Sequence, residues 1–417
     1  MPLPKVLREL LTLPTAAFVE SAVSNYVLAA LRKLPDVNVT VDRYGNVLAH
    51  FHREPKHKRP LVFAAHMDHP GFCALHMRDR RTLIAAFRGW VEPEYFTKAG
   101  VRFWSDGKWV RGRIVEVVKT APVYGLIGRT ARPEEVAVQV ARPVAPNAPG
   151  MWDLPDPVLR GDKVYARGCD DLAGCAAMLA LLQRLDDRKA ECDCYCIFTR
   201  AEEVGFVGAI ASARFRTIPV GLPIISIETS KALTPEMIGG GPILRVGDKS
   251  SIFTPALTAF CDRVAKQLLG VLGADGKPRI LANNRSATRA AARRAAAPTG
   301  KKTARSAQRS AAAFAYQRRL MDGGTCEATA YLAYGYPATG ICVALGNYHN
   351  MDTEKKRIAS EYISLGDWQR MVRWFEALVL DPRGWGGEDA ILREQMDKRY
   401  EAYLPLLHVR TEAALAW

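Results

Sequence analysis

Four apolar segments of the sequence end at, or just before, side chains that commonly bind metals. They are LVFAAH at His66, CYCIFTRAEE at Glu203, PIISIE at Glu228 and GICVALGNYH at His349. A fifth candidate, Asp170, precedes a helical pattern in ARGCDDLAGC. Loops beyond the carboxyl ends of strands in an open α/β sheet converge on one crevice, so we expect these five side chains to meet there.

The predicted set of two histidines and three carboxylates, without cysteine, indicates which metal would bind. Imidazole and carboxylate ligands suit Zn, Co or Mn better than an ion that prefers thiolates. Carboxylates shared by two ions fit a pair about 3.5–4 Å apart, as in two-metal hydrolases. The sequence therefore predicts two divalent ions, with Zn first and Co or Mn as alternatives.

Two further acids could support these ligands. Asp68 lies two residues after His66, so on a strand both side chains share a face and the carboxylate can accept the second imidazole N–H. In TRAEEVGFVGA neighbouring residues point to different sides, so Glu203 can bind a metal while Glu202 faces the substrate as general base. Each motif alone also fits a simpler interpretation: a hydrogen-bonded histidine, a helix cap at Asp170, or solvated acids at a strand end.

The remaining histidines and the cysteines give no comparable signal. Nine cysteines are too few for a disulfide scaffold in 417 residues, and they form no paired CxxC array. Cys192, Cys194 and Cys196 alternate along a predicted strand; small apolar residues in a reducing cytoplasm are favoured there over a soft-metal site. The histidines expected to be structural are His50, His52, His57, His69, His76 and His408.

The net charge of +15 is concentrated in one segment. Between Gly270 and Leu320 there are twelve Lys or Arg residues and one acid, Asp275, a net of +11. Residues 273–313 have low complexity and no periodic apolar face, so disorder or a transient helix is expected. Such a tract could bind nucleic acid through phosphates, although it lacks interleaved aromatic residues for base stacking.

The composition, 48% hydrophobic and 24% charged, is that of a globular protein long enough for more than one domain. Charges interrupt the first segment, MPLPKVLRELLTLP, and no run of about 18 apolar residues occurs. We therefore expect a soluble, cytoplasmic protein with no membrane partner.

The order of predicted elements indicates an α/β fold with an all-β insert. Helix and strand signals alternate through residues 1–72 and 163–380, which we assign to one discontinuous catalytic domain. Residues 73–162 between them show short alternating strands separated by Gly, Pro and Asp, and form a separate β-rich domain. Residues 381–417 are predicted to be a helical extension.

These motifs together resemble metallopeptidase family 42, the tetrahedral aminopeptidase and glutamyl aminopeptidase group of the cocatalytic zinc exopeptidases. The resemblance runs from about Leu10 to Leu380, outside the basic insert. It includes the interval of 104 residues from His66 to Asp170, which is short in related carboxypeptidases and acylases. The matching segments are DRYGNVLAHF, AAHMD, FRGWVEPEYFTKAGVRFW, CDDLAGC, AEEVGFVGA, GGGPIL with Asp248, and MDGGTCEA.

The resemblance implies a fold and an activity. The catalytic domain would have a mixed sheet in a three-layer αβα arrangement, and the insert would be a small β-barrel-like domain involved in oligomerisation, as a dimer or a larger assembly of dimers. The substrates would be peptides with a free N-terminus, cleaved from the amino end.

The resemblance also implies a role for each site residue. One metal would be bound by His66, Asp170 and Glu228, and the other by Asp170, Glu203 and His349, with Asp170 as the bridge. Asp68 would orient His66, and Glu202 would be the base.

The chain departs from the family pattern at several positions. The family usually has Asp where this chain has Glu228, and an acid where it has His69; the longer carboxylate of Glu228 can still bind a metal. The family's Gly-Thr-Asp motif is Gly324, Thr325 and Cys326 here. Two other functions are left open: a dinuclear amidohydrolase or deacylase acting on non-peptide amides, and a nucleic-acid-associated protein that uses residues 273–313 and has a vestigial hydrolase body.

Overall fold

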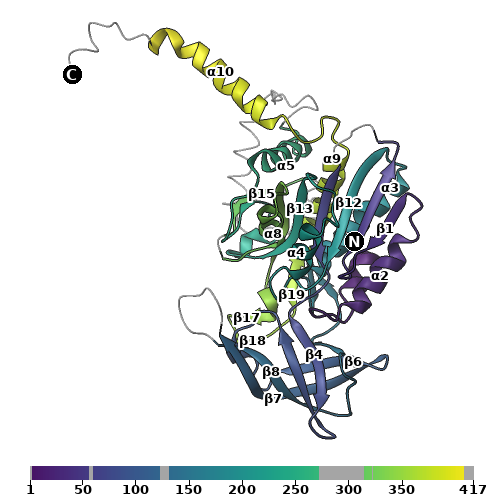
Figure 1. Ribbon diagram of the computed structural model, residues 1–417. Coiled ribbons are helices and arrows are strands. Elements are labelled where there is room, and N and C mark those ends of the chain that lie inside the picture. Colours follow the sequence, from purple (N-terminus) through teal and green to yellow (C-terminus); the bar gives the residue numbers. More distant parts are fainter. Residues whose placement is uncertain (1, 56–59, 123–130, 272–313, 322, 408–417) are drawn as a thin grey trace, which may run out of the picture.

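The computed structural model describes residues 2–55, 60–122, 131–271, 314–321 and 323–407. An α/β body carries a small β-barrel at one end and a projecting helix at the other (Figure 1). The basic insert predicted at 273–313 lies outside the described residues.

The body is built on a mixed sheet of eight strands in the order β1-β2-β12-β3-β13-β16-β14-β15. β12, β3, β13 and β16 are parallel, whereas β1–β2, β2–β12 and β14–β16 pair antiparallel. The central parallel strands are buried on both faces, which explains their continuous apolar sequences. The strands are β1 (Val37–Val41), β2 (Val47–Arg53), β3 (Leu61–His66), β12 (Cys192–Thr199), β13 (Ile224–Lys231), β14 (Ile243–Gly247), β15 (Gln317–Leu320) and β16 (Ala338–Leu345).

Helices cover both faces of this sheet. Five of them pack on one face around the largest hydrophobic cluster, which includes Phe63, Leu181 and Phe375. α4 (Val207–Arg214) and α8 (Glu327–Ala333) pack on the other face. The five are α1 (Lys5–Leu10), α2 (Ser21–Leu31), α3 (Leu172–Asp187), α5 (Pro255–Leu268) and α9 (Leu365–Val379). The expected three-layer αβα arrangement with a mixed sheet is therefore confirmed.

The insert is a closed barrel of six strands in the order β4-β5-β8-β7-β6-β9. Its interior is filled by aromatic rings: Phe72 lies 5.0 Å from Trp152, and Phe87 lies 4.8 Å from Phe96, between ring centroids. Closure pairs the strand edges that an open sheet would expose. The expected barrel-like insert is confirmed, with strands β4 (Gly71–Met77), β5 (Thr82–Arg88), β6 (Gly100–Ser105), β7 (Lys108–Pro122), β8 (Ala131–Val140) and β9 (Pro149–Trp152).

Short elements join the barrel to the body. β10 and β11 lead out of the barrel, and β11 pairs antiparallel with β19, which runs directly into α9. Ser364, the last residue of β19, caps α9 because its hydroxyl accepts the Asp367 N–H at 3.0 Å. The connecting strands are β10 (Val158–Arg160), β11 (Lys163–Ala166) and β19 (Glu361–Ser364), and the remaining short elements are β17 (Met351–Asp352), β18 (Arg357–Ile358) and the 3-10 turns η1 (Pro93–Tyr95), η2 (Pro235–Met237) and η3 (Tyr348–Asn350).

The projecting helix is α10 (Glu388–Leu407). Arg263 of α5 holds its base: the guanidinium donates to both oxygens of Asp381, at 2.9 and 3.0 Å, and lies 3.4 Å from Glu388. None of the helices in the described ranges combines the length and the apolar character needed to cross a membrane.

All nine cysteines are buried and free. Cys194 and Cys196 pack into the main core, and the potential metal-binding groups of the described residues include no cysteine. This arrangement favours small strand residues over a soft-metal site.

Burial makes these thiols unreactive, because it raises their pKa, that of Cys192 to about 12. We predict that iodoacetamide at about pH 8, below even an unperturbed thiol pKa, alkylates almost none of the cysteines in the native protein. In urea all nine should react. Intact mass spectrometry gives the number of alkylated cysteines per chain. Fast labelling of several thiols without denaturant would contradict the packing described above.

Candidate metal centre

The five expected ligands meet beyond the carboxyl ends of the central strands. His66 is the last residue of β3, Glu203 follows β12 in a short loop, and His349 lies in η3, just after β16. Asp170 stands just before α3. Glu228 differs from expectation in one respect: β13 does not end there but continues to Lys231, because its pairing with β16 extends to Leu345.

Asp170 lies between the two histidines. Its Oδ1 is 3.3 Å from Nε2 of His66, and its Oδ2 is 3.9 Å from Nε2 of His349. Each oxygen of one carboxylate thus faces a different imidazole. Two ligands of a single zinc ion, each about 2.0–2.1 Å from it, lie about 3.3 Å apart in a tetrahedron, so these spacings suit a carboxylate bridging two ions.

The two consecutive acids before α3, Asp170 and Asp171, make different contacts. The Asp171 side chain caps the helix by accepting the Gly174 N–H at 3.2 Å. This cap leaves Asp170 free, and its Oδ1 is buried without a hydrogen-bond partner among the described residues. The capping interpretation of the sequence therefore applies to the second acid and not to Asp170.

The two glutamates after β12 lie on different sides of the site. Oε2 of Glu203 is 3.5 Å from Nε2 of His349, whereas Oε2 of Glu202 is 3.9 Å from Nε2 of His66. Oε2 of Glu228 is also 3.9 Å from that His66 atom. At this site, two groups of three residues have ligand atoms within 4.8 Å of one another: His66, Asp170 and Glu203, and His66, Glu202 and Glu228. The first group combines ligands that the resemblance assigns to different ions.

Hydrogen bonds leave Nε2 of both histidines free for a metal. Nδ1 of His66 donates to the Asp68 carbonyl at 3.1 Å, and Nδ1 of His349 donates to the Trp90 carbonyl at 2.6 Å. Such bonds fix the tautomer and the ring orientation. Burial lowers the pKa of His349 to about 4, so this imidazole is neutral near pH 7, the form that binds metals.

Asp68 holds the loop that carries both glutamates. One oxygen accepts the Glu202 N–H at 3.0 Å and the other accepts the Glu203 N–H at 3.1 Å. Its Oδ1 lies 3.5 Å from Nδ1 of His66, whose closer partner is the Asp68 main-chain oxygen. Asp68 therefore acts on the two glutamates at least as directly as on His66.

The electrostatics of the site fit divalent cations. Burial, followed by the neighbouring carboxylates, raises the pKa of Glu203 well above its usual value, and burial also raises that of Glu202 and Glu228. Glu203 Oε1, like Asp170 Oδ1, is buried without a hydrogen-bond partner among the described residues. Carboxylates crowded in this way are ionised when cations lie between them.

Glu361 is the main residue that sequence reasoning missed. It is fully buried, and its Oε2 accepts the N–H groups of Cys169 at 2.7 Å and Asp170 at 3.2 Å. Its Oε1 accepts the His349 N–H at 2.8 Å. One carboxylate thus fixes the main chain of two predicted ligands, and burial raises its pKa to about 7. The only local signal was an acid inside the apolar pattern before a helix.

Two further buried side chains support the site. His69, expected to be structural, bonds through Nδ1 to the Asp170 carbonyl at 2.6 Å and through Nε2 to Asn350 at 2.9 Å. Glu327, at the start of α8, accepts the Thr199 hydroxyl at 2.5 Å, and burial raises its pKa to about 8. Glu327 directly follows the Gly324-Thr325-Cys326 motif.

A cavity of about 340 Å³ opens onto these residues. Asp170, Glu202, Glu203, Glu228 and His349 form part of its wall. Phe206, Leu233, Met321, Tyr348, Lys231 and Arg245 also line it. Its size suits an amino-acid side chain next to the predicted metal site.

Known proteins resemble this chain in sequence and in fold. The M42 glutamyl aminopeptidase family matches residues 132–269. A protein from Acetivibrio thermocellus, named provisionally as an aminopeptidase, is 27% identical over 262 residues, 60% of this chain and 74% of its own. The lysyl aminopeptidase of Pyrococcus furiosus is 25% identical over 284 residues, 62% and 76% of the two chains.

Solved structures share the fold at lower identity. The aminopeptidase APDkam598 from Desulfurococcus kamchatkensis superimposes with a TM-score of 0.65 at 19% identity, over 90% of this chain and 93% of its own. The TET1 peptidase of Pyrococcus horikoshii gives 0.63 at 18% identity, over 90% and 98%. Sequence and fold thus point the same way: the chain is similar to M42 glutamyl aminopeptidases over residues 132–269, and it shares the fold of solved aminopeptidase structures.

Proposed function

We propose that this protein is an aminopeptidase of the M42 type, which removes N-terminal residues from peptides with a two-metal centre formed by His66, Asp170, Glu203, Glu228 and His349. The observation that carries the proposal is the position of Asp170, whose two oxygens face two histidines, one at the end of β3 and the other in η3. Two divalent ions bound there, most simply Zn and alternatively Co or Mn, would supply an activated water and polarise the scissile carbonyl.

The protein's own residues supply the proton transfer and the positioning. Glu202 lines the cavity beside the predicted ligands, so it takes a proton from the attacking water and returns it to the leaving amine. Asp68 keeps Glu202 and Glu203 on their respective sides by holding both of their N–H groups.

An aminopeptidase differs from the related amidohydrolases and deacylases in requiring a substrate with a free N-terminal amine. A dinuclear amidohydrolase or deacylase would use the same carboxylates on an amide without that amine. We expect the purified protein to hydrolyse aminoacyl anilides and to leave N-acetylated anilides and N-acyl amino acids intact. Faster cleavage of the N-acyl substrates would favour the deacylase.

The charges around the cavity predict a preference for acidic N-terminal residues. Two divalent ions would neutralise the four carboxylates in the wall, which leaves the cations Lys231 and Arg245. Arg245 is buried and donates to Ser230 at 3.0 Å. An ion pair in such a setting is worth about 1 kcal/mol, so we expect kcat/KM for Glu or Asp anilides to exceed that for Lys or Arg anilides by about ten-fold or less.

Exposed Lys231 allows a clean test of this preference. In Lys231→Met the acidic preference should fall several-fold while Ala anilide is cleaved as before. Lys249→Met, an exposed lysine outside the cavity wall, is the matched control. An unchanged ratio in Lys231→Met would exclude this lysine from specificity.

We also propose that the protein forms homo-oligomers through the barrel. The Pyrococcus horikoshii TET1 peptidase is described as assembling into a tetrahedron or an octahedral shell. Here β7 of the barrel exposes Val115, Val117 and Val118, by 57%, 38% and 40%. Light scattering after gel filtration should give a dimer or a larger assembly. A cytoplasmic location and nucleic-acid binding by residues 273–313 stay hypotheses from the sequence alone.

A further inference from the structure

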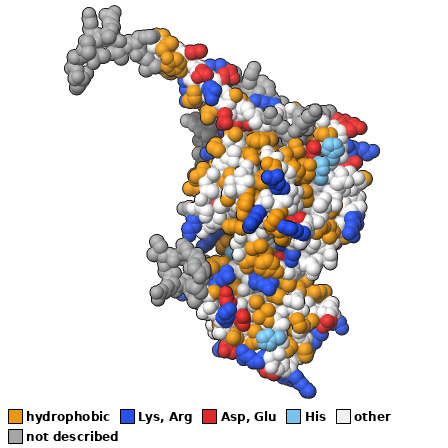
Figure 2. Space-filling model, viewed as in Figure 1, with side chains coloured by type: hydrophobic (Ala, Val, Ile, Leu, Met, Phe, Trp, Pro, Cys, Tyr) orange, Lys and Arg blue, Asp and Glu red, His pale blue; other side chains and the backbone are white. Residues whose placement is uncertain are grey.

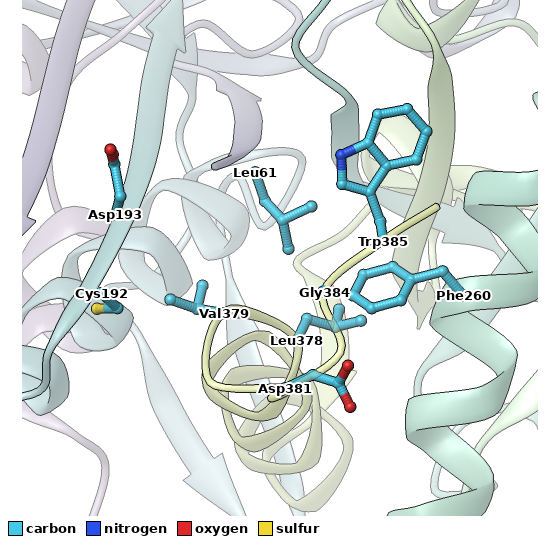
Figure 3. Close-up of a pocket in the computed structure, with 9 residues that line it drawn as sticks. All are labelled: Leu61, Cys192, Asp193, Phe260, Leu378, Val379, Asp381, Gly384 and Trp385. Atoms are coloured by element: carbon cyan, nitrogen blue, oxygen red, sulfur yellow. The ribbon is translucent and has the colours of Figure 1, made fainter. Parts of the chain in front are cut away.

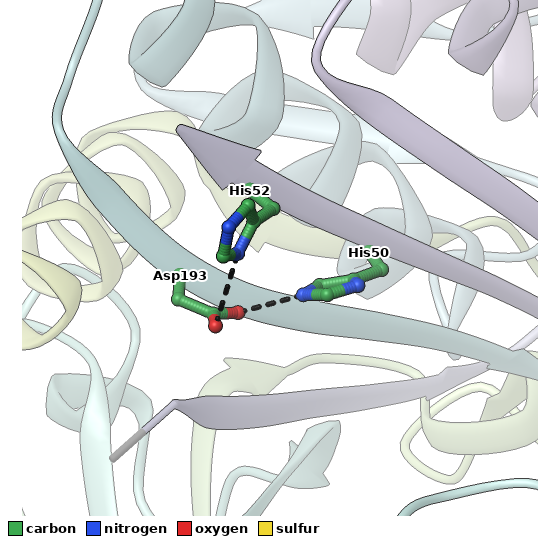
Figure 4. A group of neighbouring side chains, drawn as sticks. All are labelled: His50, His52 and Asp193. Atoms are coloured by element: carbon green, nitrogen blue, oxygen red, sulfur yellow. Dashed lines mark hydrogen bonds and ion pairs between the residues drawn. The ribbon is translucent and has the colours of Figure 1, made fainter. Parts of the chain in front are cut away.

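Two histidines and an aspartate meet on the sheet outside the candidate metal centre. Nε2 of His50 lies 2.8 Å from Oδ1 of Asp193, and Nδ1 of His52 lies 3.3 Å from Oδ2 of the same carboxylate (Figure 4). One ligand atom from each residue lies within 4.8 Å of the others. We propose that His50, His52 and Asp193 form a separate zinc site, which does not depend on the catalytic assignment.

Strand register brings the three residues together. His50 and His52 are two apart on β2, so their side chains share one face of the sheet. On the neighbouring strand β12, Asp193 pairs with His52, and Tyr195 pairs with His50. The His50 ring stacks on Tyr195 at 4.0 Å between centroids, with an angle of 7° between the planes. The ligands are therefore held by paired backbones and by a stacked ring, not by a loop.

The chemistry of the cluster suits zinc. Two imidazoles and one carboxylate, with water in the fourth position, are a common zinc ligand set. Within the described part of the chain, no Lys or Arg forms an ion pair with Asp193, whose two oxygens face the two histidines. The His52 side chain is 50% exposed, which leaves the outer side open to water. The space-filling view shows histidine side chains at the surface of the α/β body, beside acidic ones (Figure 2).

The site lies far from the catalytic centre. Asp193 is at the start of β12, whereas Thr199, at its end, pairs with His66. Six residues of strand separate them, about 20 Å at about 3.3 Å per residue. Such an ion would join the end of β2 to the start of β12 and would stabilise this edge of the sheet rather than react with substrate.

The cluster lies on the face of β12 opposite the main core. The core side beside Cys192 holds only a small cavity of about 20 Å³, lined mainly by apolar residues such as Leu61, Phe260 and Trp385 (Figure 3). Alternation along the strand places the Asp193 carboxylate on the other face, with His50 and His52. The proposed ion therefore lies on the outer face of the sheet and takes no part in the core.

Counting bound zinc in matched variants tests the proposal. After dialysis against micromolar free Zn²⁺, wild type should hold one more zinc ion per chain than His52→Asn or Asp193→Asn. His76→Asn, which alters an exposed histidine of the barrel, should bind as much as wild type. Zinc should also raise the Tm of wild type by more than that of His52→Asn, since binding stabilises the folded state. Circular dichroism in EDTA verifies that the variants fold.

The variants and wild type are compared at the same zinc concentration. The difference in zinc bound per chain therefore does not depend on how many ions the catalytic centre holds. Equal zinc content in wild type, His52→Asn and Asp193→Asn would overturn the proposal. Loss of zinc in His76→Asn equal to that in His52→Asn would also overturn it.

Discussion

Replacing Glu202 by Gln should lower kcat by about 10³-fold, within the range of about 10²–10⁴-fold expected for a general base, while the protein keeps its metals. Gln is close to Glu in size but cannot take a proton from water. The main-chain N–H of residue 202 would still donate to Asp68, as it does at 3.0 Å, so the loop should stay in place. Metal analysis and steady-state kinetics on an aminoacyl anilide give the two readouts.

The neighbouring residue provides the control for this experiment. Glu203 lies 3.5 Å from Nε2 of His349 and has a buried oxygen without a hydrogen-bond partner among the described residues. Glu203→Gln should therefore lose metal as well as activity. If Glu202→Gln turns over substrate at the wild-type rate, or if it loses metal as Glu203→Gln does, Glu202 is not the base.

Changing Glu361 to Gln should weaken metal binding and lower kcat by about 10–100-fold each, the usual effect of removing a residue that orients ligands. Both Glu361 oxygens accept main-chain N–H groups, from Cys169 and Asp170 on one side and from His349 on the other. An amide offers only one acceptor, so at least one buried N–H loses its partner, at about 1–3 kcal/mol. The Asp170 and His349 segments would then shift relative to each other.

A second buried glutamate separates positioning from general destabilisation. Glu376 of α9 is also buried, but its partners, Arg184 and Arg188 at 2.6 and 2.7 Å, are not part of the metal centre. Glu376→Gln should lower Tm without changing zinc affinity or kcat. If Glu361→Gln also lowered Tm without changing zinc affinity or kcat, Glu361 would contribute to stability alone.

The sequence was most informative where function depends on local pattern. His66, Glu203 and His349 could be proposed as neighbours in one site because an apolar strand precedes each of them, and Asp170 because it precedes a helix. The barrel was predictable because its strands alternate. Glu228 could be proposed as a ligand although β13 does not end there, since the strand is apolar up to that residue.

The sequence was least informative where function depends on pairs of residues far apart. Glu361 meets Cys169 across 192 positions, and His349 meets the Trp90 carbonyl across 259. His50 and Asp193, 143 positions apart, become neighbours only through the register of β2 and β12. Nothing in the local sequence of either partner indicates the other, so these contacts follow only from the fold.

Titrating metal into metal-free protein tests the central claim most directly. Apo-protein prepared with a chelator should be inactive on an aminoacyl anilide, and activity should rise with added Zn²⁺ or Co²⁺ until the Asp170 centre holds two ions per chain. The Asp193→Asn background removes the proposed peripheral site from this count. Full activity in protein shown by metal analysis to be free of metal, or maximal activity with a single ion, would contradict a two-metal aminopeptidase.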